Sequence, residues 1–160
     1  MKHTKWLSRT AMLLALTLVV QILGFPIYIT GPLINMMLLL ATMLIGLGSG
    51  VLIGGLTPWI ALVRGILPPP LAPVIPFIIA SNILFVLIYH LLDSKNKYLG
   101  IIIASLFKFL VLSIAVKFLI DVPAKIAQLM QTPQLITALT GGFLALFIFT
   151  YIMKTNLDQE

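Results

Sequence analysis

Lys108 occupies the position in this chain that most clearly requires a chemical explanation. It lies near the middle of the apolar run Tyr98–Leu119. The acidic residues all lie at the edges of apolar runs or in the C-terminal tail: Asp93, Asp121, Asp158 and Glu160. A buried ammonium group without a carboxylate either loses its proton or binds an anion that arrives from outside. Alternatively, the side chain extends to the end of its run or donates to backbone carbonyls.

Further polar side chains interrupt the other apolar runs: Asn35, Arg64, Asn82, Thr137 and Thr140. Arg64 keeps its charge in proteins, so it could bind an anion or anchor the chain at a membrane surface. Asn35 and Asn82 could bond to hydroxyl or amide groups of a solute, although a buried amide such as Asn82 usually joins helices. Trp59 and Tyr28 could wall a pocket or lie in an aromatic belt. Together these residue types predict a site for a small anionic solute.

Catalysis and metal binding are not expected from this sequence. The chain has no cysteine, His3 is terminal, and His90 lies near the end of an apolar run. It has neither a deep carboxylate pair nor a serine and a histidine at matching depth, which are arrangements that enzyme sites use. We therefore expect no enzymatic activity, no metal site and no cofactor.

The composition identifies the elements that must position these residues. Hydrophobic residues make up 61% of the 160 residues and charged residues 9%, whereas soluble domains carry about 25% charged residues. The chain is therefore expected to be an integral membrane protein. At roughly 20 residues per spanning helix, its length allows about six spans and a single domain over residues 1–160. The basic residues behind the net charge of +6 form no solvated block and lie mostly at the ends of apolar runs, so nucleic acid is not expected as a partner.

The apolar runs predict an all-α membrane protein with six transmembrane helices in a compact bundle. The expected spans are Thr4–Gly24, Leu33–Leu47, a third that starts near Gly50 and carries Arg64 in its outer half, Val74–Leu92, Tyr98–Leu119 and Leu135–Ile152. The expected outer loops are Phe25–Pro32 and Arg64–Pro73, and Ala124–Met130 is expected to form a short interfacial helix. Pro58 should free a backbone carbonyl that neighbouring groups must satisfy. Pro68, Pro69 and Pro70 should follow an extended polyproline path.

The distribution of cations predicts the orientation. The alternation of spans gives one side of the membrane Lys2, Lys5, Arg9, Lys95, Lys97 and Lys154, and the other side Arg64, Lys117 and Lys125. Cytoplasmic segments carry the excess of Lys and Arg, so both termini are expected in the cytoplasm. The polar residues then lie in the outer half or at the midplane. A channel would need polar residues along its whole length, so we expect capture from outside without a pore.

Two small residues on the first span suggest a contact surface. Ala11 and Ala15 are four residues apart and therefore share a helix face, and small residues allow another helix to approach closely, in the same bundle or in a partner. The segment Ala11-Met12-Leu13-Leu14-Ala15, the run Gly54-Gly55-Leu56-Thr57-Pro58 and the pair Pro76-Phe77 resemble the substrate-binding S-component of an energy-coupling factor (ECF) transporter. The resemblance covers essentially the whole chain.

The resemblance implies an importer subunit in a prokaryotic cell membrane. In that family the small face of the first helix docks on a transmembrane T subunit, which implies this role for Ala11 and Ala15. Two ATPases supply energy, the first and third loops cover an outer solute site, and the subunit topples to release a vitamin-like solute. We expect a solute of the pantothenate type, with its carboxylate at Arg64 or Lys108, its polar groups at Asn35, Asn82 and Thr137, and its apolar body at Trp59 and Tyr28. The alternative is a scaffold subunit of a membrane complex of the cell-shape type, which would bind a partner but no solute.

Overall fold

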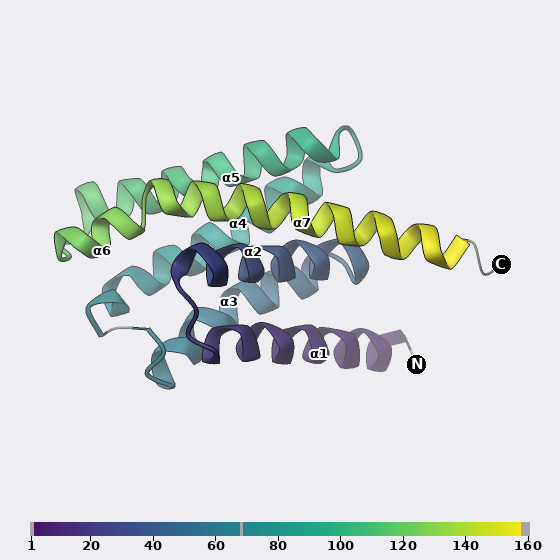
Figure 1. The fold of residues 1–160 in the computed structure, drawn as a ribbon, viewed down its shortest axis with the longest axis horizontal. Coiled ribbons are helices and arrows are strands. Elements are labelled where there is room, and N and C mark those ends of the chain that lie inside the picture. The colour runs from purple at the N-terminus through teal and green to yellow at the C-terminus, as the bar shows by residue number, and fades with distance from the viewer. Residues whose placement is uncertain (1, 68, 158–160) are drawn as a thin grey trace.

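The computed structural model describes residues 2–67 and 69–157, so Pro68, Asp158 and Glu160 lie outside it. The elements are α1 (Lys2–Ile22), α2 (Ile27–Leu44), α3 (Leu47–Val63), the 3₁₀ helix η1 (Pro69–Val74), α4 (Ile75–Leu92), α5 (Lys97–Ile114), the π-helical turn η2 (Ala115–Leu119), α6 (Ala124–Leu129) and α7 (Thr132–Leu157) (Figure 1). The described residues contain helices and no strand. The predicted all-α class is confirmed.

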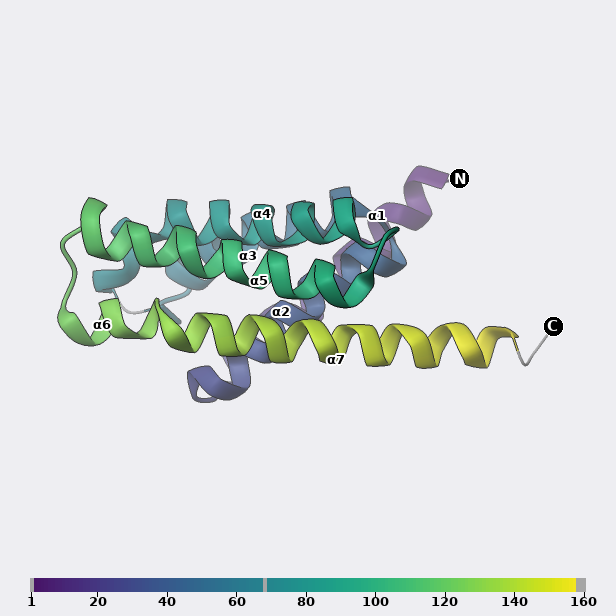
Figure 2. The same cartoon turned by 90° about the horizontal axis from the view of Figure 1, so that it is seen from above.

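The long helices run alternately up and down along one axis of the molecule. Both termini lie at one end of this bundle, and α6 lies at the opposite end (Figures 1 and 2). Helix α2 contacts α1, α3, α4 and α7, and α5 contacts α4 and α7. The main core joins α2, α4 and α5 through fully buried residues such as Leu39, Phe85 and Ala104. Helix α2 is therefore the central helix of the bundle.

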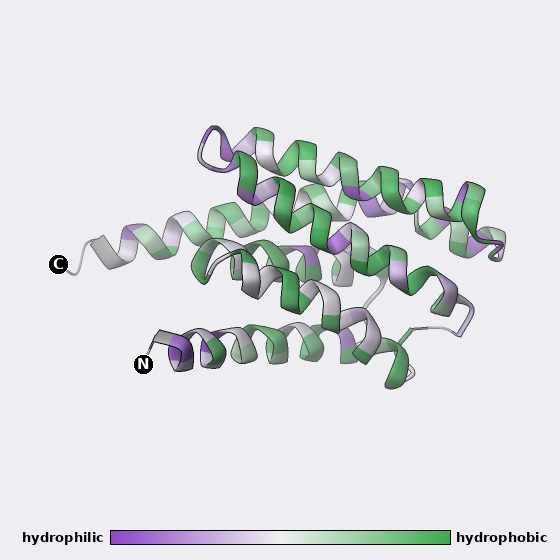
Figure 3. Ribbon diagram, turned by 180° about the vertical axis from the view of Figure 1, so that it is seen from behind, coloured by the Kyte–Doolittle hydropathy of each residue, from purple (hydrophilic) through white to green (hydrophobic). Residues whose placement is uncertain are grey.

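Hydropathy and exposure together indicate a protein that lies in a membrane. Five helical segments are long and apolar enough to cross a bilayer, and Leu47–Val63 is apolar but shorter. Figure 3 shows hydrophobic residues along the helices and hydrophilic ones mainly near their ends. Large apolar side chains such as Val63, Phe118 and Phe147 are exposed on the outside of the bundle. Such a surface is expected where lipid, rather than water, surrounds the helices.

Helix α2 begins earlier than the sequence predicts. The segment Phe25–Pro32 was expected to be a loop, but helix starts at Ile27, so that expectation is wrong. Pro26 precedes the helix with φ −52° and ψ 153°, and its carbonyl accepts from the amides of Ile29 and Thr30. Pro32 lies inside the helix and costs one backbone hydrogen bond, since proline has no N–H. The neighbouring bonds are enough to continue the helix through it.

The proline-rich connection is also tighter than an extended path. Residues Pro69–Val74 form a 3₁₀ helix, so the predicted polyproline conformation is wrong for the described prolines. The fixed φ of proline, about −65°, falls within the 3₁₀ range, and the first residues of a helix need no N–H donor. Leu71 and Val74 are buried in a second cluster with Leu112 and Met130. Packing thus folds this connection onto the end of α5.

The remaining boundaries follow the hydropathy more closely. The run Tyr98–Leu119 is helical throughout, although its last five residues form the π-helical turn. A short helix is present where one was predicted, as α6, with Lys125 and Gln128 exposed and Met130, just after it, buried. The last helix is longer than Leu135–Ile152 because polar residues continue it at both ends.

Candidate functional site: a buried lysine between two asparagines

Lys108 belongs to the inward face of α5. The buried residues of this helix recur three and four positions apart: Gly100, Ile101, Ala104, Ser105, Lys108 and Leu112. This spacing places them on one side of a helix with 3.6 residues per turn. The sequence therefore orients the lysine toward the centre of the bundle, and its side chain is only 4% exposed.

The ammonium group of Lys108 is held by two neutral amides. Its Nζ donates to Oδ1 of Asn35 at 2.5 Å and to Oδ1 of Asn82 at 2.7 Å. The same Nζ lies 5.3 Å from the centroid of the Phe85 ring, within the range of cation–π attraction. These contacts join α5 to α2 and α4. The acidic side chains that the structure describes, Asp93 and Asp121, lie outside these helices, so dipoles rather than a carboxylate stabilise the cation.

Asn82 also compensates for the proline in α3. Pro58 lies inside that helix, and since it has no N–H it leaves the carbonyl four residues earlier, that of Gly54, without its usual partner. Asn82 Nδ2 donates to this oxygen at 3.1 Å. The predicted satisfaction of the freed carbonyl is confirmed, and one asparagine connects the interruption in α3 to the ammonium on α5. We call Lys108, Asn35, Asn82 and the Gly54 carbonyl the lysine–amide network.

Helix α7 closes over the network by close contact with α2. A Cβ atom built on Gly141 would lie 2.7 Å from Cβ of Asn35, and one on Gly31 would lie 2.8 Å from Cβ of Thr137. Both distances are too short for real atoms, so these glycines allow the two helices to touch. Thr137 is 1% exposed and donates to the carbonyl of Gln134. We call this line of contacts the α2–α7 seam.

The other predicted solute residues lie away from the network. Arg64 follows the last residue of α3 and is exposed. Trp59 is 51% exposed and Tyr28 is 59% exposed. The structure therefore brings Asn35, Asn82 and Lys108 together, with Thr137 on the adjoining seam, and separates them from the arginine and the two aromatic residues.

Ala11 and Ala15 are exposed on α1. The inward face of the same helix is polar: Thr10 Oγ1 donates to Ser49 Oγ at 3.0 Å, and Thr17 and Gln21 are buried. The two alanines are thus on the side of α1 that the rest of the chain does not cover.

Some residues of the site carry only a weak sequence signal. Phe85 and Ser105 each lie three positions from a network residue on the same helix, which is the spacing of helical neighbours. Ser105 is fully buried, and its hydroxyl has no hydrogen-bond partner. Gly141 could be recognised as a site of close helix approach, although its partner could not. The three-residue spacing was the available signal for Phe85 and Ser105.

The two best-defined hollows of the described surface do not include the network. One, of about 310 Å³, lies against α1 and is lined by Thr4, Lys5, Ser8 and Arg9. The other, of about 410 Å³, includes Tyr28 and Lys125 and involves α2, α6 and α7. Within residues 2–67 and 69–157, no group of three metal-ligating side chains is present.

The fold and the network define an integral membrane protein with one deeply buried cation and amide groups around it. The chain matches the family of ECF transporter substrate-specific components over residues 5–153, which is nearly its whole length, and it belongs to that family. Its members are substrate-binding transporter subunits rather than enzymes, and they work in a bilayer with T and ATPase subunits. Comparison with curated proteins and with solved structures gave no match.

Proposed function

We propose that this subunit captures a small anionic, vitamin-like solute of the pantothenate type and delivers it through a T subunit and two ATPases. The proposal places it in a prokaryotic plasma membrane, with six spans and both termini in the cytoplasm. The cations support this orientation: Lys5, Arg9, Lys95, Lys97 and Lys154 lie toward the end with the termini, and Arg64, Lys117 and Lys125 toward the other. The side with more cations is expected to be cytoplasmic.

The observation that carries the proposal is the environment of the Lys108 ammonium. A buried charge is expensive unless it is paired, and this one is bound by two amide oxygens that carry no net charge. A carboxylate that replaced one amide oxygen would gain a charge-assisted hydrogen bond. The displaced amide could then bond to a hydroxyl or amide of the solute. An anion is therefore the ligand that this site would stabilise most.

The burial of Lys108 supports assigning the carboxylate to it rather than to Arg64. Arg64 is exposed at the end of α3, whereas Lys108 lies at the centre of the bundle. Asn35, Asn82 and Thr137 are near enough to the ammonium or its seam to bind the rest of the solute. The packing of α2 on α7 is close, so a solute that reaches Lys108 along this seam must separate these helices. Trp59 then serves at the membrane surface, while Tyr28 lines the larger hollow.

The first prediction tests this assignment with purified protein in lipid nanodiscs. Lys108→Met keeps the length of the side chain and removes the charge, so we expect at least a tenfold loss of pantothenate affinity, equal to about 1.4 kcal/mol. Arg64→Met is the matched control and should change affinity by less than about threefold. Equilibrium binding of labelled pantothenate measures both, and native mass spectrometry of the untreated protein identifies any other retained solute. Unchanged affinity in Lys108→Met for the solute so identified would remove the anion assignment.

The scaffold alternative shares the exposed alanines but needs no solute. It would be favoured if the protein retained no small molecule and if its melting temperature did not rise with any carboxylate-bearing vitamin. Binding to the native state alone must raise stability, so a ligand-dependent shift distinguishes the two functions.

A further inference from the structure

Ser105 is a buried residue whose hydroxyl the proposed function leaves unused. Its side chain is fully buried on α5, and its Oγ has no hydrogen-bond partner within the described residues. Its neighbours Ile101 and Ala104 belong to the main core, where a hydroxyl without a partner is costly. Buried polar groups are nearly always hydrogen-bonded, so each exception requires an explanation.

The other buried hydroxyls show the bonds that helices usually provide. Several of them donate to the backbone carbonyl three or four residues earlier: Thr17, Thr42, Thr57, Ser81 and Thr137. Thr10 and Ser49 bond to each other. Among the buried serines and threonines that the structure describes, Ser105 and Ser113 are the exceptions. The hydroxyl of Ser105 is therefore directed away from the backbone of its own helix and is available as a donor.

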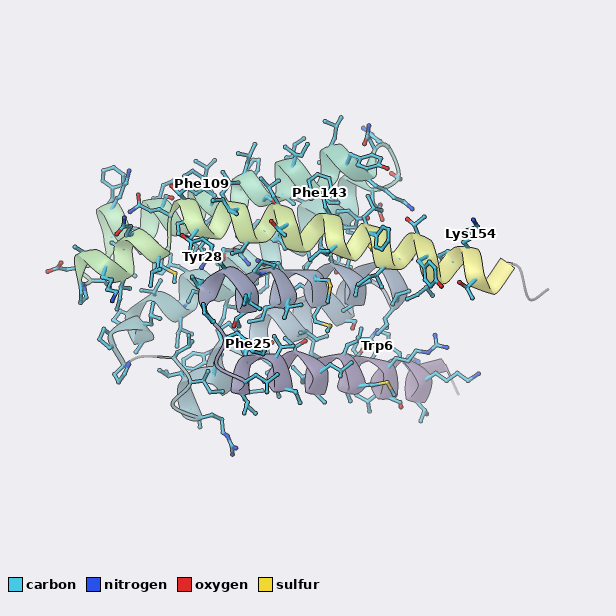
Figure 4. All side chains as sticks on the ribbon, in the orientation of Figure 1. Trp6, Phe25, Tyr28, Phe109, Phe143 and Lys154 are labelled. Atoms are coloured by element: carbon cyan, nitrogen blue, oxygen red, sulfur yellow. The ribbon has the colours of Figure 1, made fainter. Side chains whose placement is uncertain are left out.

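Ser105 lies one helical turn from Lys108, on the side nearer the termini. Helix α5 begins at that end of the bundle (Figure 1), which Trp6 and Lys154 mark in Figure 4, while Tyr28 marks the opposite end. Residues three apart on a helix are neighbours, with Cβ atoms about 5–6 Å apart. Long side chains on a helix lean toward its N-terminus, so the side chain of Lys108 leans toward Ser105.

The contacts of the ammonium agree with this direction. Lys108 Nζ lies 5.3 Å from the centroid of the Phe85 ring. Phe85 is three residues beyond Asn82 on α4, and Ser105 is three residues before Lys108 on the antiparallel α5. Since Asn82 and Lys108 are hydrogen-bonded, Phe85 and Ser105 occupy the next level of the same helix pair. The ammonium and the Ser105 hydroxyl thus border one small region beside the ring.

We infer that Ser105 is a further solute-binding residue, whose hydroxyl donates to one oxygen of the solute carboxylate while the Lys108 ammonium donates to the other. An ammonium has three N–H donors, and the described residues give two of them acceptors, on Asn35 and Asn82. The third N–H and the Ser105 O–H remain as two donors. A carboxylate has two acceptor oxygens on one carbon and no donor, so it matches both at once.

This pair of donors selects a carboxylate over an uncharged group. An alcohol would supply a single oxygen and would add an O–H that needs an acceptor of its own. Hydrogen bonds to an ionised acceptor are also about twice as strong as those between neutral groups. Ser105 therefore determines which form of a solute is bound, and Lys108 supplies the charge. The inference rests on the proposed function for the identity of the solute.

The second prediction tests Ser105 by the preference for a carboxylate. The two probes are pantothenate and pantothenol, in which a hydroxymethyl group replaces the carboxylate. For purified protein in nanodiscs, Ser105→Ala should lower the affinity for pantothenate at least about tenfold, because a hydrogen bond to a charged group is lost. The affinity for pantothenol should change by less than about threefold. Isothermal titration calorimetry measures both, and a serine that only shapes the site would weaken the two probes equally.

Ser113→Ala is the matched control. Ser113 is on the same helix, and its buried hydroxyl also has no partner, but it lies five residues beyond Lys108, away from the direction in which the lysine leans. Both affinities should stay unchanged in this variant. If Ser105→Ala leaves the ratio of the two affinities unchanged while Lys108→Met loses pantothenate, the role of Ser105 is overturned and the proposed function stands.

A measurement on the empty subunit requires no solute. Removal of a buried hydroxyl that has no partner should not destabilise the protein, so Ser105→Ala should melt at or above the temperature of the parent. A melting temperature lower by more than about 4 °C would mean that the hydroxyl is already bonded, and it would overturn the inference. A parent that binds neither probe would instead count against the proposed solute, so the two failures are read from different measurements.

Discussion

At the scale of single residues, Asn82 has the largest structural consequence. Its Nδ2 satisfies the carbonyl that Pro58 frees, and its Oδ1 accepts from the buried ammonium. Few side chains other than an amide could do both, because the two partners require a donor and an acceptor at once. Aspartate would supply a carboxylate for Lys108 but could not donate to Gly54 when ionised. The residue type is therefore explained by the proline on one helix and the lysine on another.

The third prediction concerns the replacement Asn82→Leu. It leaves the Gly54 carbonyl and one N–H of Lys108 without partners, and each unsatisfied buried group costs about 1–3 kcal/mol. We expect the free energy of unfolding to fall by about 2–4 kcal/mol. Ser113→Ala is the control, because the buried hydroxyl of Ser113 has no partner to lose, and its effect should stay within about 0.5 kcal/mol.

Denaturant unfolding in mixed micelles measures these changes. In the double variant with Lys108→Met the loss should be smaller than the sum of the two single losses, since the residues share one hydrogen bond. Additive losses would mean that Asn82 and Lys108 do not interact.

The residues of the network could be chosen from the sequence, but their mutual contacts could not. Asn35, Asn82 and Lys108 each interrupt an apolar run, so residue type and depth were sufficient to select them. Whether they meet depends on how each helix is rotated about its axis. Arg64 illustrates the difference. Helix α3 ends at Val63, so Arg64 lies just past its end and is exposed rather than buried in the bundle.

At the scale of helices, two kinds of small or rigid residue control the architecture. Prolines misled the boundary predictions, because Pro32 and Pro69 were treated as loop residues although helices accept proline in some positions. Glycines determine where helices touch, and the identity of the touching partners depends on the tertiary fold. The hydropathy was strong enough to place the span of α4, and that of α5 together with η2, within one or two residues of the structure.

The fourth prediction compares two glycines of this kind. Gly141→Ala should destabilise the protein by about 1–3 kcal/mol, because the added Cβ would lie 2.7 Å from Cβ of Asn35 and would force α2 away from α7. Gly55→Ala adds the same methyl group where nothing lies within 4 Å, and alanine favours helix by about 1 kcal/mol. That variant should be as stable as the parent or more stable. Thermal unfolding of both in the same lipid distinguishes a seam that needs glycine from a general intolerance of alanine.

At the scale of the whole molecule, α1 packs one face against the bundle and leaves the other face exposed. Its inward face carries Thr10, Thr17 and Gln21, all buried. The hydrogen bond from Thr10 to Ser49 fixes the rotation of the helix about its axis. This rotation leaves Ala11 and Ala15 exposed. Since membrane helices associate through small residues that allow close approach, the exposed alanines are suited to a partner helix, and family membership supplies one in the T subunit. Sequence spacing alone could not exclude packing inside the bundle, because the rotation of α1 depends on its tertiary contacts.

The fifth prediction separates solute capture from coupling to the partner. Ala15→Trp places an indole where a close helix contact is proposed, so transport by the assembled complex should fall at least about tenfold. Binding of solute by the isolated subunit should be unchanged, because Ala15 lies on the side of α1 opposite the buried Thr17 and away from the lysine–amide network.

Leu110→Trp is the control for the fifth prediction. Leu110 is exposed on α5, across the bundle from α1 (Figure 1), and lipid accommodates a larger side chain there. Uptake into vesicles that contain the full complex, measured beside binding by the subunit alone, tests both expectations. Normal uptake with Ala15→Trp would mean that the partner approaches another face, and loss of binding would mean that α1 contributes to the solute site itself.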